Sequence, residues 1–273
     1  VAAHQDAGGA LAAQGGDASL EGAVAGHRAL AASDRFAFAS ALAHLDHAQP
    51  LLRRHGDTDG ELFTDVLRAV ALGRSGRTAE ALRACDRAIE AARGAGHAHS
   101  LASALRNRAA LLWRSGRYAE ALSRGREALE AHAPLGDSWG ELMTRVALCA
   151  IATSTGALDE AKRHGEAGRD LVARSGFLRP LNYPDAELAW LALVSGASVA
   201  ARKGFESVLR DARAHGHVLQ RAHGLAGRAA VGRVEGQPAA ARAELVEALA
   251  LKARGPLPVH EAQVDEALIA LSH

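Results

Sequence analysis

The sequence predicts an all-α protein, a right-handed α-solenoid of helical hairpins that repeat every 40 residues. The first observation is a recurring phrase: residues 75–82 read SGRTAEAL, residues 115–122 read SGRYAEAL and residues 155–162 read TGALDEAK. The other two observations are a pair of glycine series and a pair of small-residue series with the same spacing. A fixed period of this size is typical of repeat proteins, in which each unit packs only against its neighbours.

Two glycines in each period divide every repeat into two helices of about 16 residues, each roughly 24 Å long. One series marks the boundaries between repeats: Gly16, Gly56, Gly96, Gly136, Gly176 and Gly216. The other marks the middle of each repeat: Gly76, Gly116, Gly156, Gly196 and Gly236. A helix that stops and reverses often ends in a left-handed residue, which costs a residue other than glycine about 1–2 kcal/mol.

Taken in order, residues 1–18 show little periodicity and are interpreted as a poorly defined segment, a possible remnant of a preceding repeat. Helices are expected over residues 19–32 and 36–54, and the strict register follows. Six hairpins then occupy residues 19–258, and residues 259–273 form a C-terminal capping helix. The repeat phase places the first residues partway through a helix, so we expect either a piece of a longer protein or a decayed first helix.

Small residues recur at matched points on the two helices of each hairpin. One series follows each mid-repeat glycine by five residues: Ala81, Ala121, Ala161, Ala201 and Ala241. The other precedes it by seven: Ala69, Ala109, Cys149, Ala189 and Ala229. Small side chains let two helix backbones approach closely, and overfilling such a site costs about 1–3 kcal/mol.

The amino-acid composition argues against nucleic acid as a direct partner. With 32 basic and 31 acidic residues the net charge is +1, which gives no electrostatic case for direct binding of nucleic acid. Arginine far outnumbers lysine, which we interpret as codon bias rather than a phosphate-binding signature. Cys85 and Cys149 are expected to be buried small residues, not a disulfide framework. The sequence given shows no membrane span and no signal peptide, so a cytoplasmic location is expected.

The pattern resembles the tetratricopeptide repeat. A small residue, a glycine, a bulky residue and two alanines stand at its positions as Ala109, Gly116, Tyr118, Ala121 and Ala128. The other repeats depart from it at the tyrosine position, with Thr78, Leu158, Ser198 and Pro238. The period of 40 also exceeds the usual length of about 34 residues. The resemblance implies the fold and does not specify the function.

The 40-residue repeat, which is rich in alanine and arginine, is similar to the helical-repeat region of large bacterial signal-transducing ATPases. These include ATP-binding LuxR-type activators, the maltose-regulon activator and antibiotic-pathway regulators. The resemblance implies an array that receives an inducer or a partner protein and relays this to a nucleotide-binding switch. Neither a phosphate-binding loop nor a helix-turn-helix occurs in these residues. The alternative is a free-standing adaptor that holds a protein or peptide.

In the resembling family the first helix of each hairpin lines the concave side, so its inward residues are the candidate binding surface. The three tryptophans lie on or at the start of such helices. The predicted contacts are Arg106, Trp113, Trp139, Met143, Arg145, Tyr183, Glu187, Trp190, His223 and Arg233. Flat aromatic rings supply large contact area at little entropic cost. Two alternatives stay open: the tryptophans fill gaps between alanine-rich helices, and the arginines lie on solvated faces.

Neither a cofactor nor a metal ion is expected. The pairs His97/His99 and His215/His217 lie at predicted turns three repeats apart, whereas zinc needs three or four convergent ligands. The sequence has no nucleophile elbow, no HExxH motif and no nucleotide-binding loop. The prediction is therefore a non-catalytic binding region, whose partner is a protein, a peptide or a small-molecule inducer.

Overall fold

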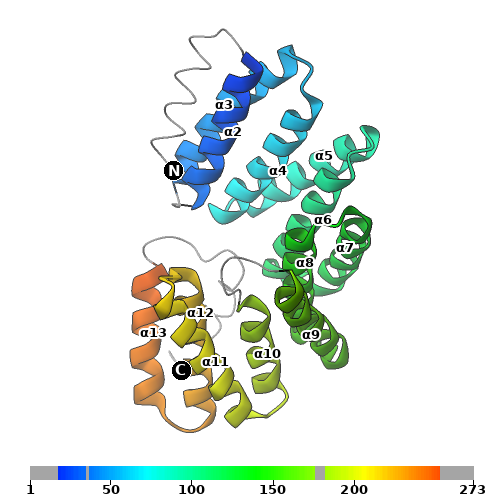
Figure 1. Ribbon diagram of the computed structural model, residues 1–273. Helices are drawn as coiled ribbons and strands as arrows, with labels where there is room; N and C mark the ends of the chain where they lie inside the picture. Colours follow the sequence, from blue (N-terminus) through cyan, green and yellow to red (C-terminus); the bar gives the residue numbers. More distant parts are fainter. Residues whose placement is uncertain (1–17, 35–36, 176–181, 253–273) are drawn as a thin grey trace. The chain divides into compact units, whose positions relative to one another are not determined.

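The computed structural model describes residues 18–34, 37–175 and 182–252. Within them, twelve α-helices and one 3₁₀ turn follow one another, and no strand occurs. Within each of the chain's two compact units, helices pack against one another in chain order, as α10 to α13 show clearly (Figure 1). The predicted all-α array of helical hairpins is confirmed.

The helices that precede each mid-repeat turn are called first-type here, and those that follow it second-type. The first-type helices are α2 (Ala18–Asp34), α4 (Thr58–Arg74), α6 (Ala98–Arg114), α8 (Ser138–Thr155), α10 (Tyr183–Val194) and α12 (Val218–Val234). The second-type helices are α3 (Phe38–Arg54), α5 (Thr78–Gly94), α7 (Tyr118–His132), α9 (Leu158–Arg174), α11 (Ser198–Ala214) and α13 (Pro238–Lys252). A 3₁₀ turn, η1 (Ala133–Leu135), follows α7.

Glycine ends the helices as the sequence predicts. Nine glycines of the two series adopt a left-handed backbone within the described residues, with φ between 64° and 82°. At the middle of one repeat, Gly76 has a φ of 81°, and the amide of Arg77 donates to the carbonyl oxygen of Leu72. This bond satisfies a helix-end carbonyl that would otherwise lack a partner. Gly16, Gly176, residues 1–17 and the predicted capping helix at 259–273 lie outside the described residues.

The two small-residue series meet inside the hairpins. In four hairpins the partners belong to the same buried cluster: Ala69 with Ala81, Cys149 with Ala161, Ala189 with Ala201, and Ala229 with Ala241. Each of these side chains is at most 3% exposed. The predicted close approach of the two helices is therefore confirmed, and its cause is the absence of bulk at the crossing point.

The chain forms two compact units, residues 1–111 and 112–273. In the first unit, leucines of α3 and α4 pack among alanines, with Leu45 and Leu67 against Ala29. In the second, the core between α8 and α9 consists of Leu142, Val146 and Leu171. Among the described helices, none is both long and apolar enough to cross a membrane.

Candidate binding surface

A partly exposed aromatic surface lies on the first-type helices of the second unit. Trp139, in the first turn of α8, is 47% exposed. Its ring meets that of Tyr183, the first residue of α10, edge to face with centroids 6.5 Å apart. Met143 lies four residues after Trp139 and so faces the same side of α8, where it is half-buried. Trp139, Met143 and Tyr183 are called the Trp139 surface below.

Local structure holds this surface in place. The N-cap residue Asp137 accepts a hydrogen bond of 2.9 Å from the amide of Gly140, which fixes the first turn of α8. Tyr183 packs against Leu142, Val146 and Leu171 and is half-buried. The Trp139 surface therefore combines a rigid base with an accessible tryptophan, which suits recognition at low entropic cost.

Trp190, seven residues after Tyr183 on α10, is buried at 8% exposure. Its indole N–H donates to His223 Nε2 of α12 at 2.5 Å, and the two rings are stacked with centroids 6.0 Å apart. An acceptor at Nε2 requires that this nitrogen carry no proton. Phe205 of α11 meets the indole edge-on at 5.3 Å. Trp190 and His223 thus connect neighbouring helices in the core.

Glu187 lies one turn before Trp190 and is only 1% exposed. Burial raises the pKa of its carboxyl group well above the ordinary range, because the charged form loses its hydration. Cys149 of α8 is close enough for the Glu187 charge to contribute to raising the pKa of its thiol, after the larger effect of burial. Glu187 is therefore a residue of the core, and its carboxyl group is shielded from bulk solvent.

Trp113 belongs to a different part of the second unit. It is 4% exposed at the end of α6, and its indole N–H donates to Ser154 Oγ of α8 at 2.9 Å. A buried tryptophan whose N–H is hydrogen-bonded acts as a packing residue. The alternative that tryptophans fill gaps between the alanine-rich helices thus describes Trp113 and Trp190, whereas Trp139 is accessible.

The three candidate arginines lie on three different first-type helices. Arg145 is half-buried and forms an ion pair of 2.7 Å with Glu141 one turn earlier on α8. Arg106 is half-buried in the first unit, and Arg233 is exposed at the end of α12. Arg106 and Arg145 are thus partly enclosed, and Arg233 is the most accessible of the three.

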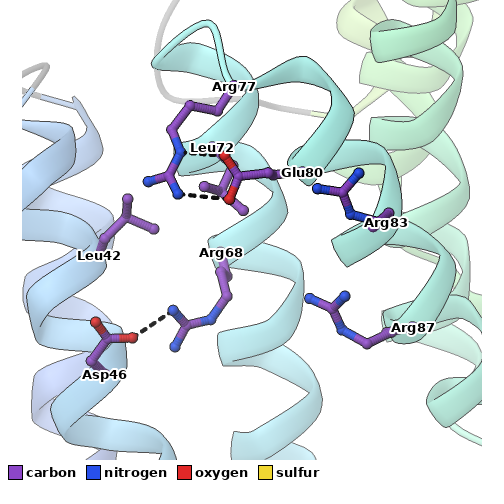
Figure 2. A pocket seen from close by; sticks show the side chains of 8 residues that line it. All are labelled: Leu42, Asp46, Arg68, Leu72, Arg77, Glu80, Arg83 and Arg87. Carbon is purple, nitrogen blue, oxygen red and sulfur yellow. Dashed lines mark hydrogen bonds and ion pairs between the residues drawn. The ribbon is translucent and has the colours of Figure 1, made fainter.

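A hollow that sequence reasoning missed lies in the first unit. It encloses about 300 Å³ between α3 and α5, with α4 between them (Figure 2). Four of its lining residues are arginines, namely Arg68, Arg77, Arg83 and Arg87. The residues that complete it are Leu42, Asp46, Leu72 and Glu80. This hollow is called the arginine groove below.

Residues 60–133, which run from α4 to the end of α7, match the family described as tetratricopeptide repeat. A comparison with curated protein sequences found no match. Over this stretch the resemblance deduced from Gly116, Tyr118 and Ala121 is confirmed. Residues 60–133 are thus similar to tetratricopeptide repeats, and the described helices on either side of them continue the same array of helical hairpins.

Solved structures share the fold over most of the chain. One is the Signal Transduction ATPase with Numerous Domains (STAND) protein with a tetratricopeptide repeat sensor from Pyrococcus horikoshii, with 16% identity and a TM-score of 0.59. A second is aspartyl phosphate phosphatase F from Bacillus subtilis, with 11% identity and a TM-score of 0.71. A third is a Rap protein complexed with Competence and Sporulation Factor, with 15% identity and a TM-score of 0.70.

These matches cover 93%, 86% and 92% of this chain, in the same order. They cover only 39%, 61% and 66% of the three solved chains. The chain thus corresponds to part of each neighbour, and identities this low show the fold alone.

Proposed function

We propose that this chain is the binding or sensor region of a bacterial transcriptional or signalling regulator. In this proposal the Trp139 surface recognises a protein, a peptide or a small-molecule inducer, and the chain itself performs no catalysis. The observation that carries the proposal is the accessible edge-to-face pair of Trp139 and Tyr183 on two neighbouring first-type helices. Exposed aromatic residues on a rigid base are the usual anchors of protein interfaces.

Two of the structural neighbours support the regulatory part of the proposal. The STAND protein is described as having a tetratricopeptide repeat sensor, and the Rap protein was solved with Competence and Sporulation Factor bound. The words ATPase and phosphatase in the neighbours' descriptions refer to the STAND protein and to aspartyl phosphate phosphatase F, chains of which this one spans 39% and 61%. Catalysis by this chain is not proposed, because Glu187, the carboxyl group with the strongly raised pKa, is enclosed in the core.

In this proposal seven of the ten residues selected from the sequence divide into two groups, and the three arginines belong to neither. Trp139, Met143 and Tyr183 contact the partner directly. Trp113, Glu187, Trp190 and His223 support the helices from within, because each is less than 9% exposed. Substitutions in the second group should therefore act through stability, and substitutions in the first through affinity.

A selection experiment tests the proposal. A random peptide library is displayed on phage and selected on the immobilised chain, and the affinities of the selected peptides are then measured in solution. A W139A/M143A variant should lose at least about tenfold in affinity, since a buried tryptophan anchor often contributes more than 2 kcal/mol. Because Trp139 is exposed and Met143 is half-buried, the variant should stay folded at the temperature of the binding assay, which its thermal melt checks.

Matched controls come from the second-type helices of the same unit. Val199 of α11 and Val246 of α13 are 66% and 59% exposed. A V199A/V246A variant removes smaller exposed apolar groups away from the first-type helices and should keep full affinity. Equal losses in the two double variants, or a selection that yields no peptide dependent on Trp139, would contradict the proposed surface.

The second candidate is a free-standing adaptor that holds a partner protein through the same surface. The tetratricopeptide match favours it as much as the regulator, because this repeat is a general protein-binding module. The reading frame that contains this sequence separates the two. A nucleotide-binding or DNA-binding domain in the same frame supports the regulator, and a frame with helical repeats alone supports the adaptor.

A further inference from the structure

The arginine groove of the first unit carries two arginines without an ion-pair partner among the described residues. Arg83 and Arg87 lie one turn apart on α5, and Figure 2 shows both side chains reaching toward α4. Neither guanidinium forms a hydrogen bond or ion pair within the part of the chain that the structure describes. Two like charges one turn apart repel each other, so their placement is unfavourable unless an anion joins them.

The remaining charges of the groove are already matched. Arg68 Nη1 donates to Asp46 at 2.6 Å, and its Nη2 donates to Gln49 at 3.1 Å. Arg77 binds Glu80 through two hydrogen bonds of 2.8 and 2.7 Å, drawn in Figure 2. The charges of Arg68 and Arg77 are therefore compensated within the protein, and the excess positive charge comes from the two arginines of α5.

The next repeat shows which of these charges belong to the fold. Forty residues later the same two pairs recur, with Arg108 donating to Asp86 at 2.6 Å. Arg117 binds Glu120 through two hydrogen bonds of 2.7 Å. Both pairs therefore recur in two consecutive repeats, which gives them a structural explanation.

Arg83 and Arg87 are not part of that repeated pattern. The corresponding positions 40 residues later hold Ser123 and Glu127. The groove thus has four arginines against two carboxylates, a net charge of +2, whereas the equivalent residues of the next repeat have two arginines against three carboxylates, a net charge of −1. A repeat register alone does not account for this reversal of sign.

The nearest carboxylates do not remove this excess charge. Arg83 lies close enough to Glu80 to contribute to lowering its pKa, but the Glu80 carboxylate is already bound to Arg77. Arg87 similarly acts on Asp65, which accepts a hydrogen bond of 2.7 Å from Gln49 and whose pKa is raised by burial. The two guanidinium groups therefore keep their donors for a ligand.

We propose that the arginine groove binds a compact multivalent oxyanion, such as a pyrophosphate group, between Arg83 and Arg87. Side chains four residues apart on a helix have Cβ atoms about 5–6 Å apart, which suits two adjacent anionic groups of one ligand. Planar guanidinium groups bind phosphate oxygens in pairs. A volume of about 300 Å³ fits a small ligand. The site is separate from the Trp139 surface and does not depend on the proposed function.

Isothermal titration calorimetry, with inorganic pyrophosphate added to the full chain at low ionic strength, tests this assignment. We expect saturable binding at one site that weakens as salt is added. The double variant R83S/R87E replaces the two arginines with the residues that the next repeat has at the same positions. It should weaken pyrophosphate binding at least about tenfold. Both positions are exposed on α5, so this variant should melt at nearly the wild-type temperature.

The matched control is R163A, because Arg163 is an exposed arginine at the Arg83 position two repeats later. It should bind pyrophosphate like the wild type. Three results would overturn the proposal: no pyrophosphate binding to the wild type, equal binding by R83S/R87E, or equal loss in R163A. A hexaglutamate peptide that binds in an Arg83-dependent manner while pyrophosphate does not would also overturn it, because the ligand class would then be an acidic polypeptide.

Discussion

The contact between Gly227 and Phe205 gives a sharp prediction about the core of the second unit. A Cβ atom added to Gly227 of α12 would overlap three carbon atoms of the Phe205 ring. That ring has no free direction in which to move, since Phe205 is 0% exposed and Trp190 packs against it at 5.3 Å. The G227A substitution should therefore overfill the space between α11 and α12.

Gly232, five residues later on α12, supplies the matched control. A Cβ atom there has its nearest neighbour, the Cβ atom of Ala241, at an ordinary contact distance of 3.5 Å. Replacing a helical glycine with alanine stabilises by about 1 kcal/mol when space allows. Overpacking costs about 1–3 kcal/mol. G232A should therefore be neutral or stabilising, and G227A should be less stable than G232A by about 1–3 kcal/mol.

Urea unfolding followed by far-ultraviolet circular dichroism measures both variants against the wild type. Adding F205L, which shortens the side chain beneath Gly227, should recover part of the loss in G227A but not improve G232A. If G227A proves as stable as G232A, the proposed packing of Phe205 on the backbone of α12 is wrong.

Three further predictions follow from burial. A121L should lower the free energy of unfolding by about 1–3 kcal/mol, because Ala121 is fully buried at the helix crossing. E120L, on the exposed side of α7, should change it by less than about 0.5 kcal/mol. Similar shifts of the two variants in a thermal melt would refute the hairpin register. Burial raises the folded-state pKa of Glu187, so its contribution to stability is complete below about pH 4.3 and falls by about 1.4 kcal/mol per pH unit as pH rises toward the folded pKa. E187Q removes this pH dependence of stability. In urea titrations, the stability of E187Q relative to the wild type should therefore increase from pH 4 to pH 7. Parallel pH profiles of the two proteins would show that the carboxyl group ionises freely. Acrylamide should quench mainly the fluorescence of Trp139, so W139F should lose most of the quenchable signal, and an unchanged quenching curve would contradict its exposure.

The hairpin register could be predicted from the sequence because the same small set of residues recurs at each crossing. Cys149 is an example: its place in the small-residue series predicted both its burial and its packing against the second helix of the hairpin at Ala161. The left-handed turn at Gly76 was predictable for the same reason. Such features depend on local geometry that every repeat shares.

The binding surface was less predictable, because periodicity assigns a face of a helix but not the depth of burial. Trp139 and Trp190 both lie on first-type helices, yet the indole of Trp190 is covered by Phe205 and His223, and that of Trp139 is accessible. The cover comes from side chains on other helices. The helix α10 also begins only at Tyr183, with Pro184 in its first turn, so its start departs from the repeat length.

The arginine groove was missed for a different reason. The near-zero net charge and the general excess of arginine over lysine hide a local imbalance, and the arginines were interpreted as codon bias. A comparison of Arg83 and Arg87 with Ser123 and Glu127, one repeat later, contains the signal. Only the structure shows that the two side chains reach into the same hollow as Arg68 (Figure 2).

Oxidation of Met143 tests the partner surface most directly. Met143 is the sole methionine of the sequence and is half-buried beside Trp139, so one added oxygen in the intact mass reports on this surface. Burial raises the pKa of the Cys85 and Cys149 thiols, and both side chains are 0% exposed, which limits their oxidation under mild peroxide. With a saturating methionine-free peptide from the selection, Met143 should oxidise several-fold more slowly than in the free chain. An unchanged oxidation rate at saturation would contradict the assignment of the Trp139 surface as the partner site.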